Sequence, residues 1–244
     1  TCTVRLLCWS RNCFKLFLIM KLYIVSTPIG NLKDITLRAI ETLKEVDFIL
    51  CEDTRTSGNL LNHFEIKKEL ISLNAFNEKN KIEFIVNRIL SNQTAALISD
   101  AGTPLISDPG VRLVSACIEK DIEIIPIPGP SALIAALSMS GLPTDAFVFE
   151  GFLPQKKGRQ TKLKELAEEN RTIVLYESTY RIEKLLKELN EFLPNRLVVV
   201  CREITKKFEE NWRGFPKDIL ETLENKTIKG EFVVVIAPKD WIVK

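Results

Sequence analysis

The sequence predicts a two-domain α/β protein, with a mainly parallel sheet in the first half, a mixed sheet in the second and helices flanking both. Short aliphatic strands alternate with segments of helical spacing from Met20 onward, which is typical of parallel sheets joined by crossover helices. In the second half, residues 197–201 and 209–215 are extended segments in direct succession. This succession favours a mixed sheet there.

In the first half, strands and helices are expected in strict alternation. The strands are expected at residues 22–26, 48–51, 94–99 and 122–127, and the helices at residues 37–45, 79–91, 109–120 and 133–139. The helix at 79–91, for example, has Ile82, Ile85, Val86 and Ile89 on one face. His63 is interpreted as a helix-end residue.

The pattern breaks at the turn-forming residues 141–145 (Gly-Leu-Pro-Thr-Asp), and we expect a domain boundary there. The two domains are therefore predicted at residues 20–140 and 141–244. In the second domain, strands are expected at residues 146–150, 172–176, 197–201, 209–215 and 232–237, with helices after Arg181 and at residues 216–224. The first of these helices has an apolar face of Ile182, Leu185, Leu186 and Leu189, which must pack on a sheet.

Residues 1–19 form a leader of different composition, with three basic residues, three cysteines and no acid. Its apolar run at residues 14–20 is broken by Lys15 and is too short to span a membrane. The basic-then-apolar order is similar to a signal or transit peptide, but a clean apolar core and a small-residue cleavage site are missing. Because a good strand follows Met20 at once, we expect the native protein to start there, and targeting is the alternative.

The remaining composition is that of an ordinary globular protein and excludes several functions. Without the leader, 31 basic residues face 32 acidic ones, so any basic surface must be local. Cys51, Cys117 and Cys201 lie in apolar elements and form no Cys-x-x-Cys pair, which favours reduced thiols and a cytoplasmic protein. A single histidine gives a metal site or a Ser-His-Asp triad little to build on, and we expect no metal and no membrane partner.

The loop at residues 98–110 (Ile-Ser-Asp-Ala-Gly-Thr-Pro-Leu-Ile-Ser-Asp-Pro-Gly) is the strongest candidate for a ligand site. It follows a strand and precedes a helix, and open parallel sheets bind ligands at this edge. Its two carboxylates, glycines and hydroxyls expose backbone and polar groups. The alternative is an ordinary strand-to-helix connection stiffened by proline, but such connections are usually shorter, typically about 2–6 residues.

Three other segments could contribute to the same site or to its surface. Residues 27–32 follow the first strand but lack the Gly-x-Gly-x-x-Gly dinucleotide fingerprint. Residues 52–55 (Glu-Asp-Thr-Arg) lie either at the rim of the cleft or in a helix N-cap network around Thr54. In residues 128–132, Ser131 offers a hydroxyl and an N–H to a ligand, and a tight helix cap is the alternative.

A basic stretch at residues 155–164 contains Lys156, Lys157, Arg159, Lys162 and Lys164 and no acid. These side chains either form a solvated surface or contact phosphate.

Short segments throughout the chain together resemble the motifs of one family, the 16S rRNA cytidine 2′-O-methyltransferases (small-subunit methyltransferase I) of the tetrapyrrole methylase superfamily. The resemblance runs from Met20 to about Pro238, in order and without large gaps, which argues against chance agreement. The segments are residues 27–32, 52–55, 99–104, 108–110, 128–132, 150–154, 176–178, 202–206 and 229–231.

This resemblance implies two α/β domains with S-adenosylmethionine in the cleft between them, in a homodimer. It also implies the reaction, which is methylation of the ribose 2′-hydroxyl of cytidine 1402 in the 16S rRNA of the small ribosomal subunit. The implied cofactor contacts are Pro28, Ala101, Gly102, Thr103, Ile106, Ser131, Ala132, Glu177 and Ile204. We add Asp100, because a carboxylate near this loop could pair with the cofactor's positive charge.

The transfer needs an acceptor for the hydroxyl proton, since a 2′-hydroxyl is a poor nucleophile until it loses that proton. The candidates are Asp53, Glu177 and Glu203, with Lys206 if its pKa is lowered by burial or by a neighbouring cation, and the sequence does not choose among them. Expected RNA phosphate contacts are Arg55, Arg181 and Arg202, extended by Lys156, Lys157 and Arg159.

Two other functions stay open. One is a methyltransferase that keeps the fold and cofactor but acts on a tetrapyrrole, and residues 52–55 and 176–178 argue instead for the rRNA branch. The other is a non-catalytic RNA-binding or ribosome-assembly factor on the same scaffold. The intact proline and glycine loops argue against it, because a protein without a cofactor has no need for them.

Overall fold

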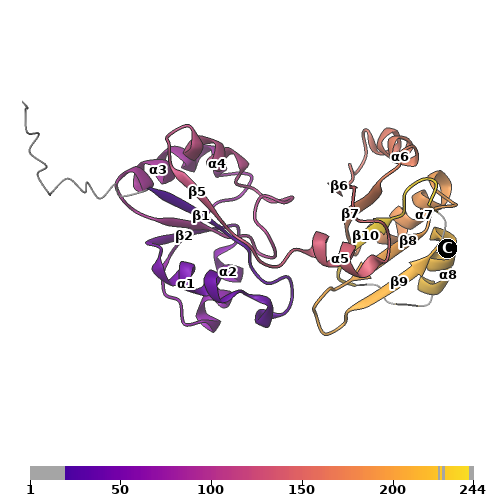
Figure 1. Cartoon of the computed structure of the whole chain (residues 1–244), viewed down its shortest axis with the longest axis horizontal. Coiled ribbons are helices and arrows are strands. Elements are labelled where there is room, and N and C mark those ends of the chain that lie inside the picture. The colour runs from indigo at the N-terminus through magenta and orange to yellow at the C-terminus, as the bar shows by residue number, and fades with distance from the viewer. Residues whose placement is uncertain (1–19, 225, 227–228, 242–244) are drawn as a thin grey trace, which may run out of the picture.

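The computed structural model describes residues 20–224, 226 and 229–241, and the predictions for residues 1–19 lie outside this range. Two α/β lobes lie side by side, each built on its own five-stranded sheet (Figure 1). The predicted α/β class is therefore confirmed.

The first sheet has the order β3-β2-β4-β1-β5, and all its strand pairs are parallel. Its strands are β1 (Lys21–Val25), β2 (Phe48–Cys51), β3 (Glu69–Ser72), β4 (Ala95–Leu97) and β5 (Glu123–Ile127). The helices are α1 (Leu37–Glu45), α2 (Thr54–His63), α3 (Glu78–Leu90) and α4 (Val111–Ile118), with a short 3₁₀ turn η1 (Leu32–Asp34). His63 does end a helix, as predicted.

Helices cover both faces of this sheet, α3 and α4 on one and α1 and α2 on the other (Figure 1). Because both faces are covered, every side chain of strand β2 is buried. Phe48 and Leu50 pack under α3 and α4, whereas Ile49 and Cys51 pack under α1 and α2, and all four are fully buried. A strand that is buried on both faces has apolar residues at every position, and the sequence of β2 (Phe-Ile-Leu-Cys) shows this pattern.

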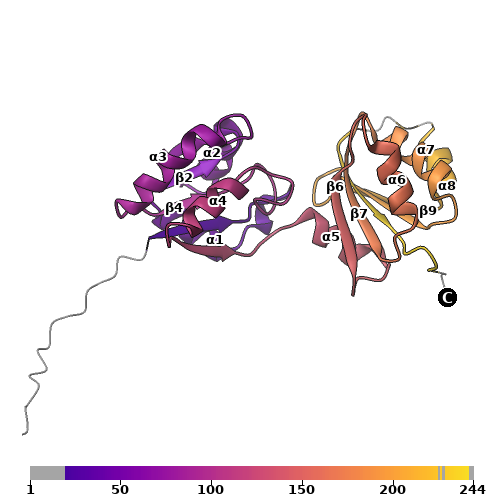
Figure 2. The same cartoon turned by 90° about the horizontal axis from the view of Figure 1, so that it is seen from above.

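The second sheet has the order β6-β7-β10-β8-β9 and is mixed, as predicted. Only β6 and β7 pair in parallel among its described strands, and the other pairs are antiparallel. The strands are β6 (Phe147–Phe152), β7 (Thr172–Ser178), β8 (Val198–Arg202), β9 (Glu210–Gly214) and β10 (Glu231–Ile236). Helices α6 (Arg159–Ala167), α7 (Ile182–Phe192) and α8 (Pro216–Leu223) pack together on one face of this sheet (Figure 2).

Helix α5 (Ala132–Ser140) covers the opposite face of the second sheet. Its Leu133, Ala136 and Leu137 belong to one apolar cluster with Val199 and Val233, and both views show α5 beside the second lobe (Figures 1 and 2). The predicted boundary after residue 140 assigned this helix to the first half, and its packing places it with the second. A helix that is apolar almost all round gives the sequence no sign of which sheet it will meet.

Strand β3 and helix α6 were not expected from the sequence. Strand β3 is the edge strand of the first sheet and has no fully buried residue, so its apolar pattern is weak. Helix α6 begins in the basic stretch at residues 155–164, and its buried Leu163 and Leu166 are separated by charged residues that hide the apolar pattern.

No helix in the described part of the chain is both long and apolar enough to cross a membrane. Cys51, Cys117 and Cys201 are free thiols and buried. Burial raises the pKa of the Cys117 and Cys201 thiols to about 11, so both remain protonated and unreactive at neutral pH.

The apolar face of α7 predicts a large stability cost for truncation. Leu185 is fully buried under the second sheet, and Leu185→Ala should lower the free energy of unfolding by about 2–5 kcal/mol, because it leaves a cavity. Leu37→Ala is the control, since Leu37 is 78% exposed and its loss should change stability by less than about 0.5 kcal/mol. Urea unfolding followed by circular dichroism measures both, and equal losses would contradict the described packing.

Candidate functional site

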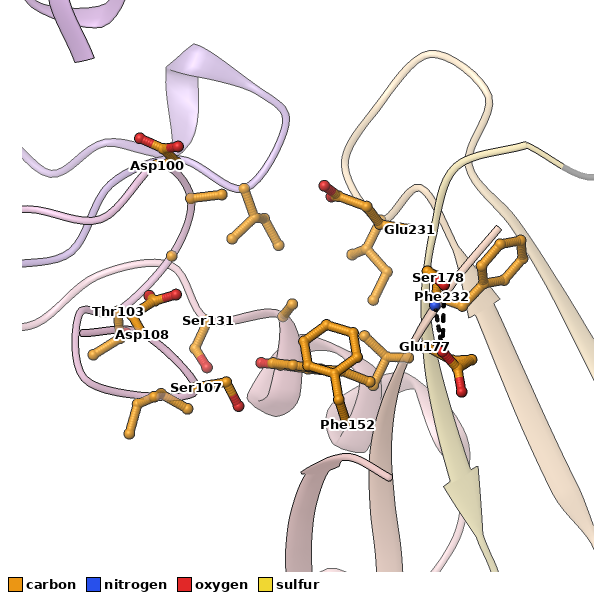
Figure 3. A pocket seen from close by; sticks show the side chains of 18 of the residues that line it. Asp100, Thr103, Ser107, Asp108, Ser131, Phe152, Glu177, Ser178, Glu231 and Phe232 are labelled. Atoms are coloured by element: carbon orange, nitrogen blue, oxygen red, sulfur yellow. Dashed lines mark hydrogen bonds between the residues drawn. The ribbon is translucent and has the colours of Figure 1, made fainter. Parts of the chain in front are cut away.

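A cleft of about 400 Å³ lies between the two lobes, at the carboxyl ends of the first sheet's strands. Its first wall is formed by Ile29, the loop from Asp100 to Asp108, and Ser131 with Ala132. The second wall is formed by the ends of β6, β7 and β10 and by residues 203–206 (Figure 3). The volume falls in the range of about 300–1,000 Å³ that is usual for small-molecule sites.

Backbone pairing fixes the loop after β4 against the turn after β1. The Thr27 N–H donates to the Gly102 carbonyl at 2.8 Å, and the Gly102 N–H donates back to the Thr27 carbonyl at 3.0 Å. Gly102 has a φ of +83°, which glycine adopts without strain. Pro28, the residue after Thr27, is buried and does not itself line the cleft, whereas Ile29 does.

Thr103 connects the same loop to the turn after β5. Its hydroxyl donates to the Pro130 carbonyl at 3.1 Å and lies 3.1 Å from the Ser26 hydroxyl. Ser131 is the N-cap residue of α5, and its hydroxyl makes no capping hydrogen bond within the described residues. The Ser131 side chain instead lines the cleft (Figure 3). Ala101, Gly102, Thr103, Ile106, Ser131 and Ala132, all expected from the sequence, thus meet at one wall.

The two lobes approach each other closely around this loop. Leu105 and Ser107 adopt left-handed φ values of +74° and +69°, an uncommon conformation for residues other than glycine. A Cβ atom on Gly151 would lie 2.8 Å from the Ser107 hydroxyl oxygen, so a larger residue would force that side chain to move, and the φ of +59° at Gly151 also favours glycine. Across the cleft, a Cβ atom on Gly30 would collide with the side chain of Lys206. Strain of this kind concentrates at ligand sites.

Glu177 is fully enclosed and does not offer a free carboxylate. Its side chain accepts an ion-pair contact from Arg181 at 2.8 Å and lies 3.8 Å from the Arg159 guanidinium. It also accepts a hydrogen bond from the Ser178 N–H at 2.8 Å (Figure 3). The Glu177 carboxylate is therefore buried and already engaged by these partners, although the residue does line the cleft.

Asp53 and Arg55 bind each other outside the cleft lining. Asp53 caps α2 by accepting from the Arg55 N–H at 2.8 Å, and the Arg55 guanidinium contacts the same carboxylate at 2.6 Å. Hydrogen bonds from the Arg55 side chain and backbone lower the pKa of Asp53 to about 2. The helix-cap interpretation of residues 52–55 is thus confirmed, and so low a pKa makes Asp53 a weak base.

Glu203 and Lys206 form an ion pair at 3.0 Å on the second wall, and Lys206 also contacts Glu231 at 2.9 Å. Burial works against both charges, but hydrogen bonds outweigh it, so the pKa of Glu203 is lowered and that of Lys206 is raised. The condition set for Lys206 as a base, a lowered pKa, is not met. Ile204 between them is buried and lines the cleft.

Asp108 is the cleft carboxylate that sequence reasoning did not select. Burial, together with the negative charges of Glu52 and Asp100, raises its pKa to about 6. Burial and the Asp53 carboxylate likewise raise the pKa of Asp100, which accepts a hydrogen bond from the Asp53 N–H at 3.2 Å. The second acid of the loop at residues 98–110 was visible in the sequence, but Glu52, the larger cause among its negative neighbours, comes from the end of a different strand.

The expected RNA contacts divide into exposed and engaged side chains. Lys156 and Lys157 are exposed, and Arg55 is 88% exposed despite its pairing with Asp53. Arg181 is bound to Glu177, and Arg202 is bound to Glu210.

Arg159 does not belong to this basic surface, contrary to the expectation from the sequence. It is 3% exposed, and its guanidinium contacts Glu188 at 2.7 Å and donates to the Pro154 carbonyl at 3.1 Å. The residue stands at the first turn of α6, whose inward face the sequence pattern did not indicate.

Across residues 20–224, 226 and 229–241, no group of three or more His, Cys, Asp or Glu side chains is arranged to hold a metal ion.

A doubly wound parallel sheet whose loops face a second α/β unit across a cleft defines an enzyme class that binds a small molecule at the strands' carboxyl ends. Residues 21–219 match the family model of the tetrapyrrole (corrin/porphyrin) methylases. A relative from Synechocystis named ribosomal RNA small subunit methyltransferase I is 51% identical, with 88% of this chain and 78% of the relative covered. A relative of that name from Thermotoga maritima is 47% identical, with 90% of this chain and 99% of the relative covered.

Solved structures agree on the fold. A cobalt precorrin-4 methyltransferase superposes with a TM-score of 0.65 at 19% identity, with 89% of this chain and 95% of that one covered. A uroporphyrin-III C-methyl transferase from Thermus thermophilus, complexed with S-adenyl homocysteine, has a TM-score of 0.63 at 16% identity, with 89% and 97% covered. The chain belongs to the tetrapyrrole methylase family, whose methyl donor is S-adenosylmethionine, and within it to the ribosomal RNA small subunit methyltransferase I group.

Arg159, the buried arginine of α6, should stabilise the folded protein. Arg159→Met leaves Glu177 and Glu188 without one of their cationic partners. We therefore expect the free energy of unfolding to fall by about 3–5 kcal/mol. The exposed neighbour gives the control, and Lys157→Met should change stability by less than about 0.5 kcal/mol. Chemical denaturation measures both variants. A fully stable Arg159→Met protein would contradict the structural role.

Asp108 should make stability depend on pH. Its pKa is about 6 in the folded protein against about 4 in the unfolded chain, so the folded state is favoured below pH 4 and this contribution is lost as the pH rises through 6. Asp108→Asn should therefore gain stability relative to wild type at pH 8. The upper limit is about 3 kcal/mol, because one pKa unit corresponds to about 1.4 kcal/mol and solvent screens a half-buried carboxyl.

Thermal unfolding at pH 4 and pH 8 measures this difference. Asp34→Asn, at an exposed position, is the control and should show a similar difference from wild type at both pH values. A pH-independent effect of Asp108→Asn would contradict the assignment.

Proposed function

We propose that the protein transfers a methyl group from S-adenosylmethionine to the ribose 2′-hydroxyl of cytidine 1402 in the 16S rRNA of the small ribosomal subunit. The observation that carries this proposal is the similarity to relatives named ribosomal RNA small subunit methyltransferase I, which are 46–51% identical over 88–90% of the chain. The solved tetrapyrrole methyltransferases, at 16–19% identity, support only the fold.

The first wall of the cleft is suited to the cofactor. Asp100 and Asp108 supply negative charge for a sulfonium and an ammonium group, and the hydroxyl groups of Thr103 and Ser131 offer further hydrogen bonds. Close approach of the ligand to the backbone is possible at Gly102. We assign cofactor contacts to Asp100, Ala101, Gly102, Thr103, Ile106, Ser131 and Ala132, with Ile204 and the Glu177 backbone opposite.

S-adenosylmethionine supplies a methyl group that its sulfonium already activates. The chain's own residues then have to align the ribose oxygen, exclude water and accept one proton. Asp108 is the cleft residue best suited to accept it, because a pKa of about 6 leaves it ionised at neutral pH yet more basic than an ordinary aspartate. Glu203 is the alternative on the other wall, although its pKa is lowered.

RNA is expected to reach the cleft over a local basic surface, since the overall charge is nearly balanced. Lys156 and Lys157 lie exposed just before α6, and Arg55 is exposed beyond the opposite wall. Arg181 and Arg202 can add contacts only as far as their pairs with Glu177 and Glu210 allow. A homodimer, which the family resemblance implies, is part of the same proposal.

Methyl transfer from labelled S-adenosylmethionine tests this function. Small subunits that lack the modification should accept label at a cytidine ribose, whereas free rRNA and a tetrapyrrole precursor serve as parallel substrates. Gly102→Trp should reduce transfer at least 100-fold, because a side chain at a φ of +83° enters the cofactor wall beside Ile29.

Circular dichroism must show that Gly102→Trp remains folded, and calorimetry with S-adenosylhomocysteine should show lost binding. Transfer to the tetrapyrrole alone would move the protein to that branch of the family. Cofactor binding without transfer to any substrate would refute the proposal, and failure to bind cofactor would favour a non-catalytic scaffold.

A further inference from the structure

Phe152 presents a large apolar ring inside the cleft. It ends strand β6, is 51% exposed and lines the cleft together with the cofactor loops. Figure 3 shows it between the loops that carry Ser107 and Ser131 and the strand end that carries Glu177. Single exposed phenylalanines are common on protein surfaces, but this one lines the cleft, so a ligand that enters the cleft can cover the ring and gain from burying it.

A β-bulge brings the ring to this position. The pairing of β6 with β7 runs from Phe149 opposite Val174 to Gly151 opposite Leu175, so Glu150 is the extra residue. Without the bulge, Phe149 and Phe152 would point to opposite faces of the sheet, because side chains alternate along a strand. With it, Phe152 lies opposite Tyr176 on the same face as Phe149, toward α5 and the cleft. Bulges commonly redirect side chains beside active sites.

The neighbours of Phe152 hold the ring without covering it. Tyr176 meets it edge to face, with centroids 5.7 Å apart, and contacts Phe149 in the same way at 4.9 Å. The Arg181 guanidinium stands 5.7 Å from the Phe152 centroid and is fixed by its 2.8 Å contact with Glu177. An aromatic ring beside an anchored arginine is the combination on which unstacked nucleobases are held in RNA-binding proteins.

We infer that the Phe152 ring is the stacking surface for the nucleobase of the target nucleotide once that base has left the RNA stack. The inference rests on the proposed function and deepens it, because a ribose can reach the cofactor wall only if its base also enters the cleft. The base then covers the exposed ring, and Arg181 is left to contact the adjacent phosphate or the base edge. Lys156 and Lys157 follow Phe152 closely in the chain and are exposed, so they are available to contact the phosphates that flank the target nucleotide.

Substitution of the ring tests this role. Phe152→Leu should lower kcat/KM for unmodified small subunits by about 5- to 150-fold, the range that loss of one base-stacking aromatic produces. Phe152→Trp should restore most of the activity, since it keeps a stacking face. Affinity for S-adenosylhomocysteine, measured by calorimetry, should stay within twofold of wild type in both variants.

Phe84 provides a matched control. It is 55% exposed on α3, and the Arg88 guanidinium stands 5.8 Å from its ring, which repeats the environment of Phe152 on a different lobe. Phe84→Leu should leave methyl transfer unchanged, because Phe84 lies outside the cleft. This result would exclude a general effect of replacing an exposed phenylalanine beside an arginine.

A substrate without the target base separates stacking from mere structural support. Small subunits whose RNA carries an abasic ribose at the target position should be methylated slowly by the wild type, and Phe152→Leu should cost less than twofold on them. An equal loss on normal and abasic subunits would overturn the inference. Absence of wild-type transfer to normal subunits would instead refute the proposed function, so the two failures are distinguishable.

Discussion

The site depends on one pair of backbone hydrogen bonds, between Thr27 and Gly102. These bonds tie the turn after β1 to the loop after β4, and the Thr103 hydroxyl extends the tie to Pro130 in the turn after β5. Three strand ends that are neighbours in the sheet thereby form one continuous wall. Because this wall is made largely of backbone and small side chains, it leaves room for a ligand that larger residues would fill.

Close contact between the lobes is the second requirement. Gly30 faces Lys206, and Gly151 faces Ser107, at distances where a larger residue would force the neighbouring side chain to move. The residues around these contacts adopt strained backbone conformations, at Leu105 and Ser107 on one lobe and at Glu203 and Thr205 on the other. Such conformations persist only where the surrounding packing holds them. The narrow cleft thus results from interactions in both lobes.

Buried charge on the second lobe serves the same site. Glu177 is held between Arg159 and Arg181, so the end of β7 is anchored to α6 and to the start of α7. Arg181 in turn stands beside Phe152, which lines the cleft. Glu177, suggested by the sequence as a base, and Arg159, suggested as an RNA contact, are both buried and paired with other charges of this lobe. Because Arg159 pairs with Glu177 at the end of β7, its contacts connect the buried charges of this lobe to the cleft wall.

The sequence by itself determined the local elements and the polar loops at the strand ends. The apolar runs predicted most strands, and the composition of residues 98–110 predicted a ligand loop, because each depends on neighbours along the chain. Only the tertiary structure decided which sheet α5 covers, which charges are paired and where Phe152 points. These properties depend on contacts between distant segments. The charge state of Asp108, set by burial and by Glu52 and Asp100, is one example, and the bulge in β6 is another.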